Sequence, residues 1–169
     1  GVVYRAVQSS TGRCVAIKLM RGGALASPAD RARFDREVRI LALLKHPNIV
    51  PIYDSGQAGG WNYFVMDYIA GAPLDEFASN RALSCDAVVE LIARVCEAVD
   101  AAHVRGIIHR DLKPANVRVD ANGDPHVLDF GLAKQPEIDN EDFDQTKTGQ
   151  FVGSLPWASP EQVSGGAAH

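Results

Sequence analysis

The feature that most constrains the fold is a charged segment set between apolar stretches, His109-Arg110-Asp111-Leu112-Lys113-Pro114-Ala115-Asn116. A second short motif, Asp129-Phe130-Gly131, closes an apolar stretch a little further along the chain. Between the two motifs, Asn122-Gly123 is a strong signal for a tight β-hairpin. A hairpin returns the chain to its starting point, so the sequence predicts that Asp111 and Asp129 share one cleft.

These residue types in this order favour phosphoryl transfer. A hydroxyl that attacks a phosphate needs an acceptor for its proton, and Asp111 is placed for that role. Asn116 and Asp129 offer the hard oxygen ligands that Mg²⁺ prefers beside substrate phosphates. A surface turn with incidental charges is the alternative for the His109 segment, and the second motif disfavours it.

A lysine on an apolar strand is the next candidate, in Val15-Ala16-Ile17-Lys18. Side chains alternate along a strand, so Ala16 and Lys18 face the same side. There the small Ala16 leaves room for a flat base, and the ammonium of Lys18 meets phosphates. Glu37, on the helix that follows, is expected to pair with Lys18. The alternatives are a strand lysine that points to solvent and a solvated helix glutamate.

The first part of the chain is predicted to be rich in strands. Apolar runs and turn residues predict strands over 2–7, 14–20, 49–53 and 61–68, with the glycines of 56–60 as a connection. Ser27 as N-cap and Pro28 at the first helical position predict a helix over 28–44. Gly71 and Pro73 then mark a break between two parts.

The second part is predicted to be mainly helical. Apolar residues recur at helical spacing from Val88 to Ala102, with Ser84 as N-cap and Gly106 at the C-terminal end. Short strands are expected around 107–108, 117–119 and 126–128. The polar stretch over 134–151 shows no periodicity and predicts a loop.

Composition argues against several other functional classes. The 169 residues carry a net charge of −4, which gives no overall basic surface for nucleic acid. Three cysteines, Cys14, Cys85 and Cys96, show neither close pairing nor metal-ligand spacing, so reduced core residues are expected. No apolar run reaches the length of a membrane span, and no secretion signal is visible. The opening without Met and the close without a terminal helix predict a fragment truncated at both ends.

Together these motifs resemble the protein kinase superfamily over the whole chain, and most of all the bacterial eukaryotic-type (Hanks-type) serine/threonine kinases. The resemblance implies an α+β fold with two lobes, a β-rich N-lobe over 1–70 and the first part of a mainly helical C-lobe over 71–169. It also implies a catalytic set of Lys18, Glu37, Asp111, Lys113 and Asn116, with Asn116 and Asp129 as ligands of Mg²⁺. Lys113 is the residue typical of the serine/threonine class.

The same resemblance implies a set of residues around ATP. Gly1 stands as the third glycine of a glycine-rich loop and Val3 as the valine above the adenine. The remaining ATP contacts that it implies are Ala16, Lys18, Met66 as gatekeeper, the hinge Asp67, Tyr68 and Ile69, and Arg118 under the base. An apolar residue is usual at the position of Arg118. The aliphatic stem of Arg118 fits beneath the base with its charge toward water, or the charge weakens ATP binding; both alternatives stand.

Control residues are implied as well. Arg110 stands where the family keeps an arginine that meets a phosphorylated residue of the activation loop, and Thr146 and Thr148 stand where bacterial relatives autophosphorylate. Ser154 replaces a usual threonine and keeps the hydroxyl that positions the substrate, near Asp111 and Lys113.

The expected function is therefore transfer of the ATP γ-phosphoryl group to Ser or Thr hydroxyls of proteins, with Mg²⁺ and with autophosphorylation between paired copies. The alternatives are a pseudokinase or nucleotide-binding scaffold, a related small-molecule kinase, and an inactive fragment of an active kinase. The kinase domain is expected in the cytoplasm. Because relatives often carry a membrane span and sensor domains, the resemblance leaves open whether the parent protein is anchored in a membrane.

Overall fold

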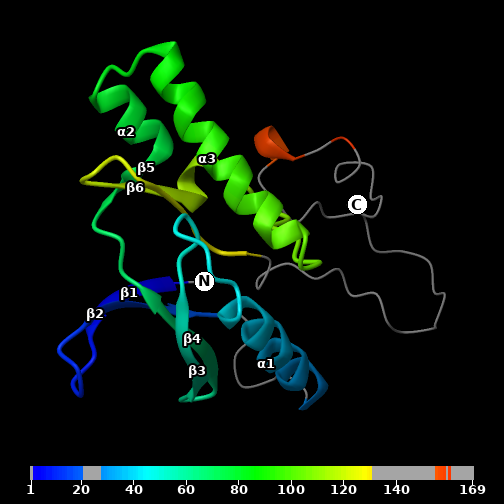
Figure 1. Cartoon of the computed structure of the whole chain (residues 1–169). Helices are drawn as coiled ribbons and strands as arrows, with labels where there is room; N and C mark the ends of the chain where they lie inside the picture. Colours follow the sequence, from blue (N-terminus) through cyan, green and yellow to red (C-terminus); the bar gives the residue numbers. More distant parts are fainter. Residues whose placement is uncertain (1, 21–27, 131–154, 159, 161–169) are drawn as a thin grey trace.

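A four-stranded antiparallel sheet forms the first part of the molecule (Figure 1). A computed structural model gives the fold and describes residues 2–20, 28–130, 155–158 and 160. The strands are β1 (Val2–Val7), β2 (Cys14–Leu19), β3 (Ile52–Ala58) and β4 (Trp61–Asp67), in the order β1-β2-β4-β3. Gly59 and Gly60, both with positive φ, make the tight turn between β3 and β4.

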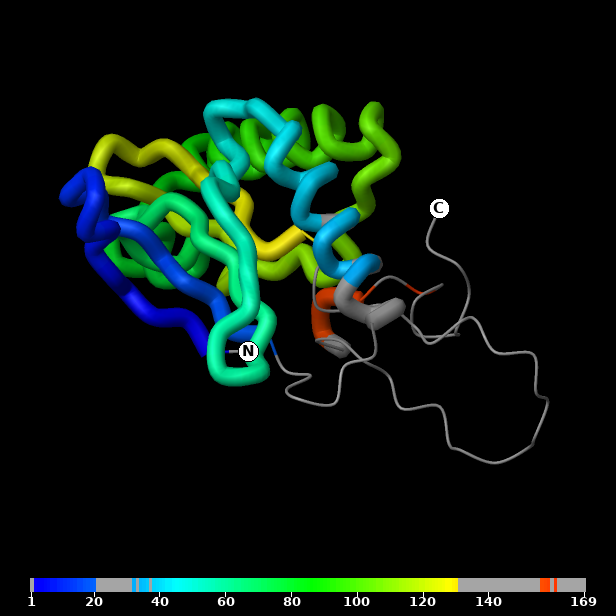
Figure 2. Tube along the Cα trace, turned by 90° about the horizontal axis from the view of Figure 1, so that it is seen from below, coloured from blue at the N-terminus to red at the C-terminus, as the bar shows by residue number. Residues whose placement is uncertain are grey.

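Helix α1 (Pro28–Ala42) covers one side of this sheet through a narrow apolar stripe. Phe34 and Val38, one turn apart, are buried with Phe64 and Met66 of β4. Figure 2 shows the same arrangement from below, with the blue and teal strands beside the light-blue helix. Ala16 of β2 belongs to the same buried cluster, which links the strand that carries Lys18 to the helix.

The second part combines two helices with a three-stranded sheet. Its strands are β5 (Gly71–Pro73), β6 (Val117–Asp120) and β7 (Pro125–Val127), in that order. Its helices are α2 (Leu74–Asn80), α3 (Cys85–His103) and the short 3₁₀ turns η1 (Pro114–Asn116) and η2 (Leu155–Trp157). Val117, Val119 and Val127 are almost fully buried and pack against α3.

Helix α3 begins and ends as its sequence predicts. The Ser84 hydroxyl accepts a hydrogen bond from the backbone N–H of Ala87 at 3.3 Å, which satisfies one free N–H of the first turn. Gly106 takes the positive φ of 73° expected after a helix end. Among the described residues, no helix is long and apolar enough to cross a membrane.

A short connection before β3 ties the two parts together. The buried Asn48 donates from Nδ2 to the carbonyl oxygen of Pro125 at 2.7 Å, and its own carbonyl accepts from the N–H of Val127 at 2.8 Å. Leu44 and Ile49 belong to the core cluster of the second part. The predicted lobe boundary between residues 70 and 71 stays a prediction. Residues of this connection, which come before that boundary in the chain, pack with residues that come after it.

Several sequence expectations need correction. The third strand runs over 52–58 rather than 49–53, so Gly56 lies inside it. The break at Gly71 is instead strand β5, which leads directly into the unpredicted α2. Residues 107–108 form no strand, and α1 ends before 43 and 44. Cys85 and Cys96 are exposed on α3 instead of lying in the core.

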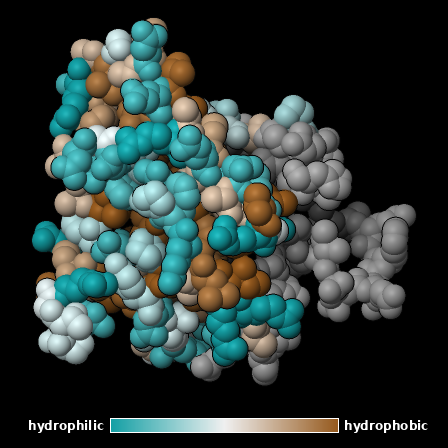
Figure 3. All heavy atoms as spheres, in the orientation of Figure 1, coloured by the Kyte–Doolittle hydropathy of each residue, from teal (hydrophilic) through white to brown (hydrophobic). Residues whose placement is uncertain are grey.

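The front face of the molecule is mainly hydrophilic, with hydrophobic residues showing in its middle (Figure 3). Exposed apolar side chains include Val89 and Ile92 of α3, Ile40 of α1, and Leu43 directly after α1.

Candidate active site

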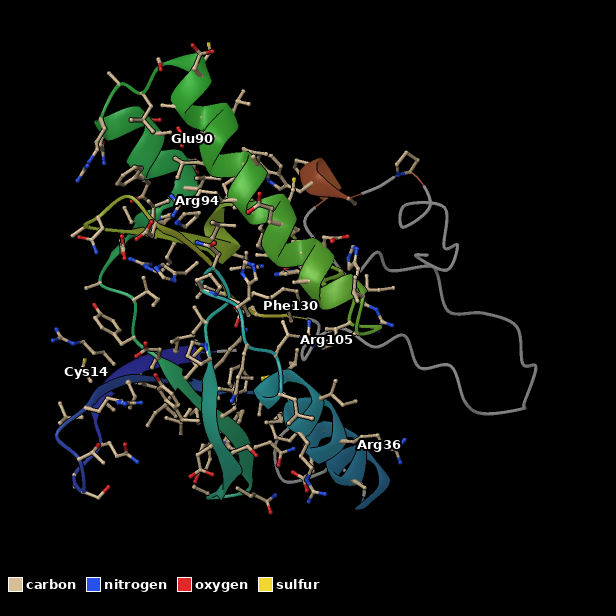
Figure 4. All side chains as sticks on the ribbon, in the orientation of Figure 1. Cys14, Arg36, Glu90, Arg94, Arg105 and Phe130 are labelled. Atoms are coloured by element: carbon tan, nitrogen blue, oxygen red, sulfur yellow. The ribbon has the colours of Figure 1, made fainter. Side chains whose placement is uncertain are left out.

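The loop after α3 is held in place by one buried histidine. His109 is 2% exposed, and its Nε2 lies 2.7 Å from the carbonyl oxygen of Leu128 while its Nδ1 lies 3.3 Å from the N–H of Asp111. Both contacts are satisfied by the neutral ring that carries its proton on Nε2. The His109 and Phe130 rings lie 4.8 Å apart, and Phe130 sits between α1 and α3 (Figure 4).

Two residues of the same loop hold the Asp111 carboxylate. Lys113 Nζ lies 3.1 Å from Asp111 Oδ2, and Asn116 Nδ2 donates to the Asp111 carbonyl at 2.8 Å and faces Oδ2 at 3.4 Å. Because the Asn116 amide turns its nitrogen to this loop, its Oδ1 lies on the opposite side of the group. Three members of the predicted catalytic set, Asp111, Lys113 and Asn116, are thus gathered around one carboxylate.

The two parts meet at a second carboxylate. Lys18 Nζ, from β2, lies 2.7 Å from Asp129 Oδ2, and the side chains are 11% and 21% exposed. Asp129 Oδ1 is buried and has no hydrogen-bond partner among the described residues. The structure therefore brings Lys18 to Asp129, a pairing that the sequence did not predict. For Glu37 only the backbone, within α1, is described, so its pairing with Lys18 stays a prediction.

Backbone strain marks both motifs. Arg110 has a φ of 62° and Asp129 a φ of 59°, in the left-handed region that residues other than glycine seldom adopt. Such conformations cost about 1–3 kcal/mol and persist only where surrounding contacts impose them. Here the hydrogen bonds of His109, next to Arg110, and the ion pair of Asp129 with Lys18 hold the two strained residues in place.

The pKa of His109 is set mainly by the burial of its ring. Desolvation lowers the pKa of His109 below its ordinary value, against the smaller opposite effects of the Leu128 carbonyl and of the Asp129 and Asp111 carboxylates. The ring is thus neutral near pH 7, which matches the acceptor role of its Nδ1.

The predicted adenine contacts lie together on one face of the first sheet. Ala16 pairs with Met66 across β2 and β4, and both are buried. Val3 pairs with Lys18 and so faces the same side. The predicted hinge continues from this face, with Asp67 at the end of β4 and the partly buried Tyr68 and Ile69 packed against the same core cluster.

Arg118 lies on β6 of the second sheet. It is partly buried on β6, and its Nη2 donates to the carbonyl oxygen of Gly71, while its Nε is buried without a partner among the described residues. The described part of the chain does not include Gly1, Thr146, Thr148 or Ser154, so their predicted roles stay untested.

Three contacts were missed from the sequence. Leu128 packs into the core cluster of the first sheet, Arg5 stacks over the Tyr68 ring at 4.9 Å, and Asn48 joins the two parts. A His-Pro-Asn tripeptide directly after a helix was the available signal for Asn48. Nothing in the sequence around Arg5 indicated a contact with a residue so distant along the chain.

The donors present fit a magnesium ion. Asp129 Oδ1 is a buried carboxylate oxygen without a hydrogen-bond partner in the described part of the chain, and Asn116 offers an amide oxygen. Mg²⁺ prefers such hard oxygens, held by one or two side chains and completed by substrate phosphates.

The comparisons with known proteins agree with this geometry. The family model described as "Protein kinase domain" matches residues 1–169. PknB of Lactococcus lactis is 40% identical over 168 residues, covering 98% of this chain and 26% of that protein. PknB of Mycobacterium tuberculosis is 37% identical over 158 residues, covering 90% and 25%. The chain thus spans about a quarter of the length of these relatives.

A solved structure shares the fold. The kinase domain of Mycobacterium tuberculosis PknI aligns with a TM-score of 0.71 and 28% identity, covering 98% of this chain and 61% of that one. With matches along its whole length, this chain belongs to the protein kinase domain family, and its relatives are bacterial Hanks-type serine/threonine kinases.

Proposed function

We propose that this protein transfers the γ-phosphoryl group of ATP to Ser or Thr hydroxyls of proteins. The observation that carries the proposal is the Asp111 carboxylate, held by Lys113 at 3.1 Å and by Asn116 in the same loop. A carboxylate fixed in this way accepts the proton of an attacking hydroxyl and orients its oxygen toward the phosphorus.

Two cations serve the phosphates. Lys113, beside Asp111, is placed to meet the transferred phosphoryl group, and Lys18 meets the phosphates from the side of the first sheet. Fixed positive charge at the sites where negative charge develops is the main source of catalysis in this reaction, together with positioning. Mg²⁺, held by Asp129 and Asn116, would neutralise phosphate charge in addition.

The substrate class follows from the Lys113 position and from the named relatives. Lys113 follows two residues after Asp111, as in the serine/threonine class, and the relatives are named serine/threonine-protein kinases. The rival proposal is a nucleotide-binding scaffold without transfer. All the expected groups, Lys18, Glu37, Asp111, Asn116 and Asp129, are present in the sequence, which disfavours it.

Transfer of label from γ-labelled ATP to myelin basic protein tests the proposal. We expect Asp111→Asn to lower the rate by about 10²–10⁴-fold, the usual contribution of a general base. ATP binding should change little, because Asp111 acts on the acceptor hydroxyl. Asp100→Asn, on the exposed side of α3, is the matched control and should retain wild-type activity.

Two outcomes would contradict the proposal. Undiminished transfer by Asp111→Asn would place the chemistry elsewhere. Wild-type protein that binds ATP with Mg²⁺ and transfers nothing would support the scaffold instead.

A further inference from the structure

Arg118 faces the first sheet from the second one. Its neighbours Val117 and Val119 are 2% and 0% exposed in the helical core, so by alternation Arg118 points to the other face of β6. On that face the neighbouring Leu128 packs into the core cluster that contains Ala16 and Met66. Arg118 therefore borders the space where the proposed function places the nucleotide.

One end of the Arg118 guanidinium is fixed. Nη2 donates to the carbonyl oxygen of Gly71, at the start of β5. This carbonyl belongs to backbone that is pressed onto β6, because a Cβ at Gly71 would overlap the carbonyl oxygen of Val119. The anchor is rigid, so the rest of the guanidinium has little freedom.

The other end of the group is the nitrogen Nε. Nε of Arg118 is buried and has no acceptor among the described residues. The cross-strand neighbours do not supply one: Pro73 has no polar side-chain atom, and His126 Nε2 is engaged with Asp120 Oδ2 at 3.3 Å. A buried N–H of a charged group without an acceptor is unfavourable, so a ligand that supplies one gains affinity.

The ribose of the nucleotide is the part that fits this donor. The acceptor lone pairs of a purine lie in its ring plane, so a donor below the base is poorly aligned with them. The ribose stands out of that plane and presents hydroxyl oxygens. We propose that Arg118 is a specificity-determining residue whose Nε–H donates to a ribose hydroxyl while Nη2 stays on Gly71. The proposal rests on the proposed function.

The test compares ATP with 2′-deoxy-ATP and 3′-deoxy-ATP as phosphoryl donors in the same transfer assay. For wild type we expect kcat/KM to be about tenfold higher with ATP than with one of the two deoxy analogues, mainly through KM, as for one hydrogen bond from a charged donor. Arg118→Leu and Arg118→Met should reduce that preference to less than about twofold. The control variant Arg105→Leu removes an exposed arginine at the end of α3 (Figure 4). It should retain the wild-type preference for ATP over the deoxy analogue.

The ratio between two nucleotides within one protein does not depend on how much of that protein is folded, so a merely structural role of Arg118 would leave it unchanged. A preference that persists in Arg118→Met, or a wild type that uses all three nucleotides equally, overturns the ribose contact. Both results leave the proposed function intact. Wild type that neither binds Mg·ATP in calorimetry nor transfers phosphate overturns the two proposals together.

Discussion

Lys18 of the first sheet and Asp129 of the second part form an ion pair of 2.7 Å between Nζ and Oδ2, with both side chains mostly buried. Removal of one partner from such a pair leaves a buried charge without compensation, which costs more than removal of both. The pair therefore contributes to the contact between the two parts as well as to the proposed chemistry.

A double-mutant cycle on this pair is the first prediction. Lys18→Met and Asp129→Asn should each stop transfer, because each removes one group of the phosphate and Mg²⁺ assembly. In chemical unfolding, the double variant should be more stable than the sum of the single changes predicts, by about 1–3 kcal/mol. Strictly additive changes in unfolding free energy would show that the two groups do not interact in the folded protein.

The pH dependence of stability gives the second prediction. The folded pKa of His109 lies below its unfolded value of about 6.5, because burial disfavours the charged ring. Below pH 6.5 the unfolded chain binds a proton that the folded chain does not. The free energy of unfolding should therefore fall by up to about 1.4 kcal/mol per pH unit from 6.5 down to the folded pKa of His109.

The measurement is urea unfolding at several pH values between 7.5 and 5. His109→Phe loses two hydrogen bonds and should be less stable than wild type at pH 7.5. Its stability should nevertheless fall less steeply with pH, so the two curves converge at low pH. Curves that stay parallel over this range would mean that His109 does not titrate as its burial requires.

The parts of the fold that were predicted correctly depend on local signals. The α3 helix has a serine N-cap, a long apolar stripe and a glycine after its end, and all lie close together in the chain. The antiparallel hairpin of β6 and β7 follows from Asn122-Gly123 in the same way. Where the local pattern was ambiguous, tertiary pairing decided: Gly56 lies in β3 because its backbone pairs with Tyr63 of β4.

The sequence predicted which residues belong to the candidate site, but it did not predict the contacts that Lys18 and Arg118 make there. The sequence predicted Glu37 as the partner of Lys18 and placed Asp129 in one cleft with Asp111, and only the packing of the two parts brings Asp129 to Lys18. Arg118 shows the same limit. Its departure from an apolar floor was visible, whereas its anchor on Gly71 depends on the unpredicted strand β5.

Autophosphorylation is the third prediction. We propose that Thr146, Thr148 or both carry phosphate in active protein, since a phosphate adds nearly two negative charges that pair with a cation such as Arg110. Thr146→Ala/Thr148→Ala should lower transfer well below wild type, and Thr11→Ala, in the exposed turn after β1, should not. Mass spectrometry of wild type checks the sites, and unmodified threonines with full activity in the double variant would exclude this control. A rate of self-labelling that rises with protein concentration would indicate phosphorylation between two copies.

Asn48 gives the last prediction, on the contact between the two parts. It is 6% exposed, and its Nδ2 is 2.7 Å from the carbonyl oxygen of Pro125. Asn48→Ala leaves that buried carbonyl without its donor, so the unfolding free energy should fall by about 1–3 kcal/mol. Asn80→Ala, at the exposed end of α2, should change it by less than about 0.5 kcal/mol.

Asn48→Asp separates the hydrogen bond from the packing, because it keeps the shape of the side chain. At pH 7 the new carboxylate cannot donate, and one of its oxygens faces the Pro125 carbonyl oxygen, so this variant should be less stable than Asn48→Ala. Near pH 4 the protonated acid donates a hydrogen bond again. The difference in unfolding free energy between the two variants should therefore become smaller or change sign. If Asn48→Asp were as stable as wild type at pH 7, the bond to Pro125 would contribute nothing to the contact between the two parts.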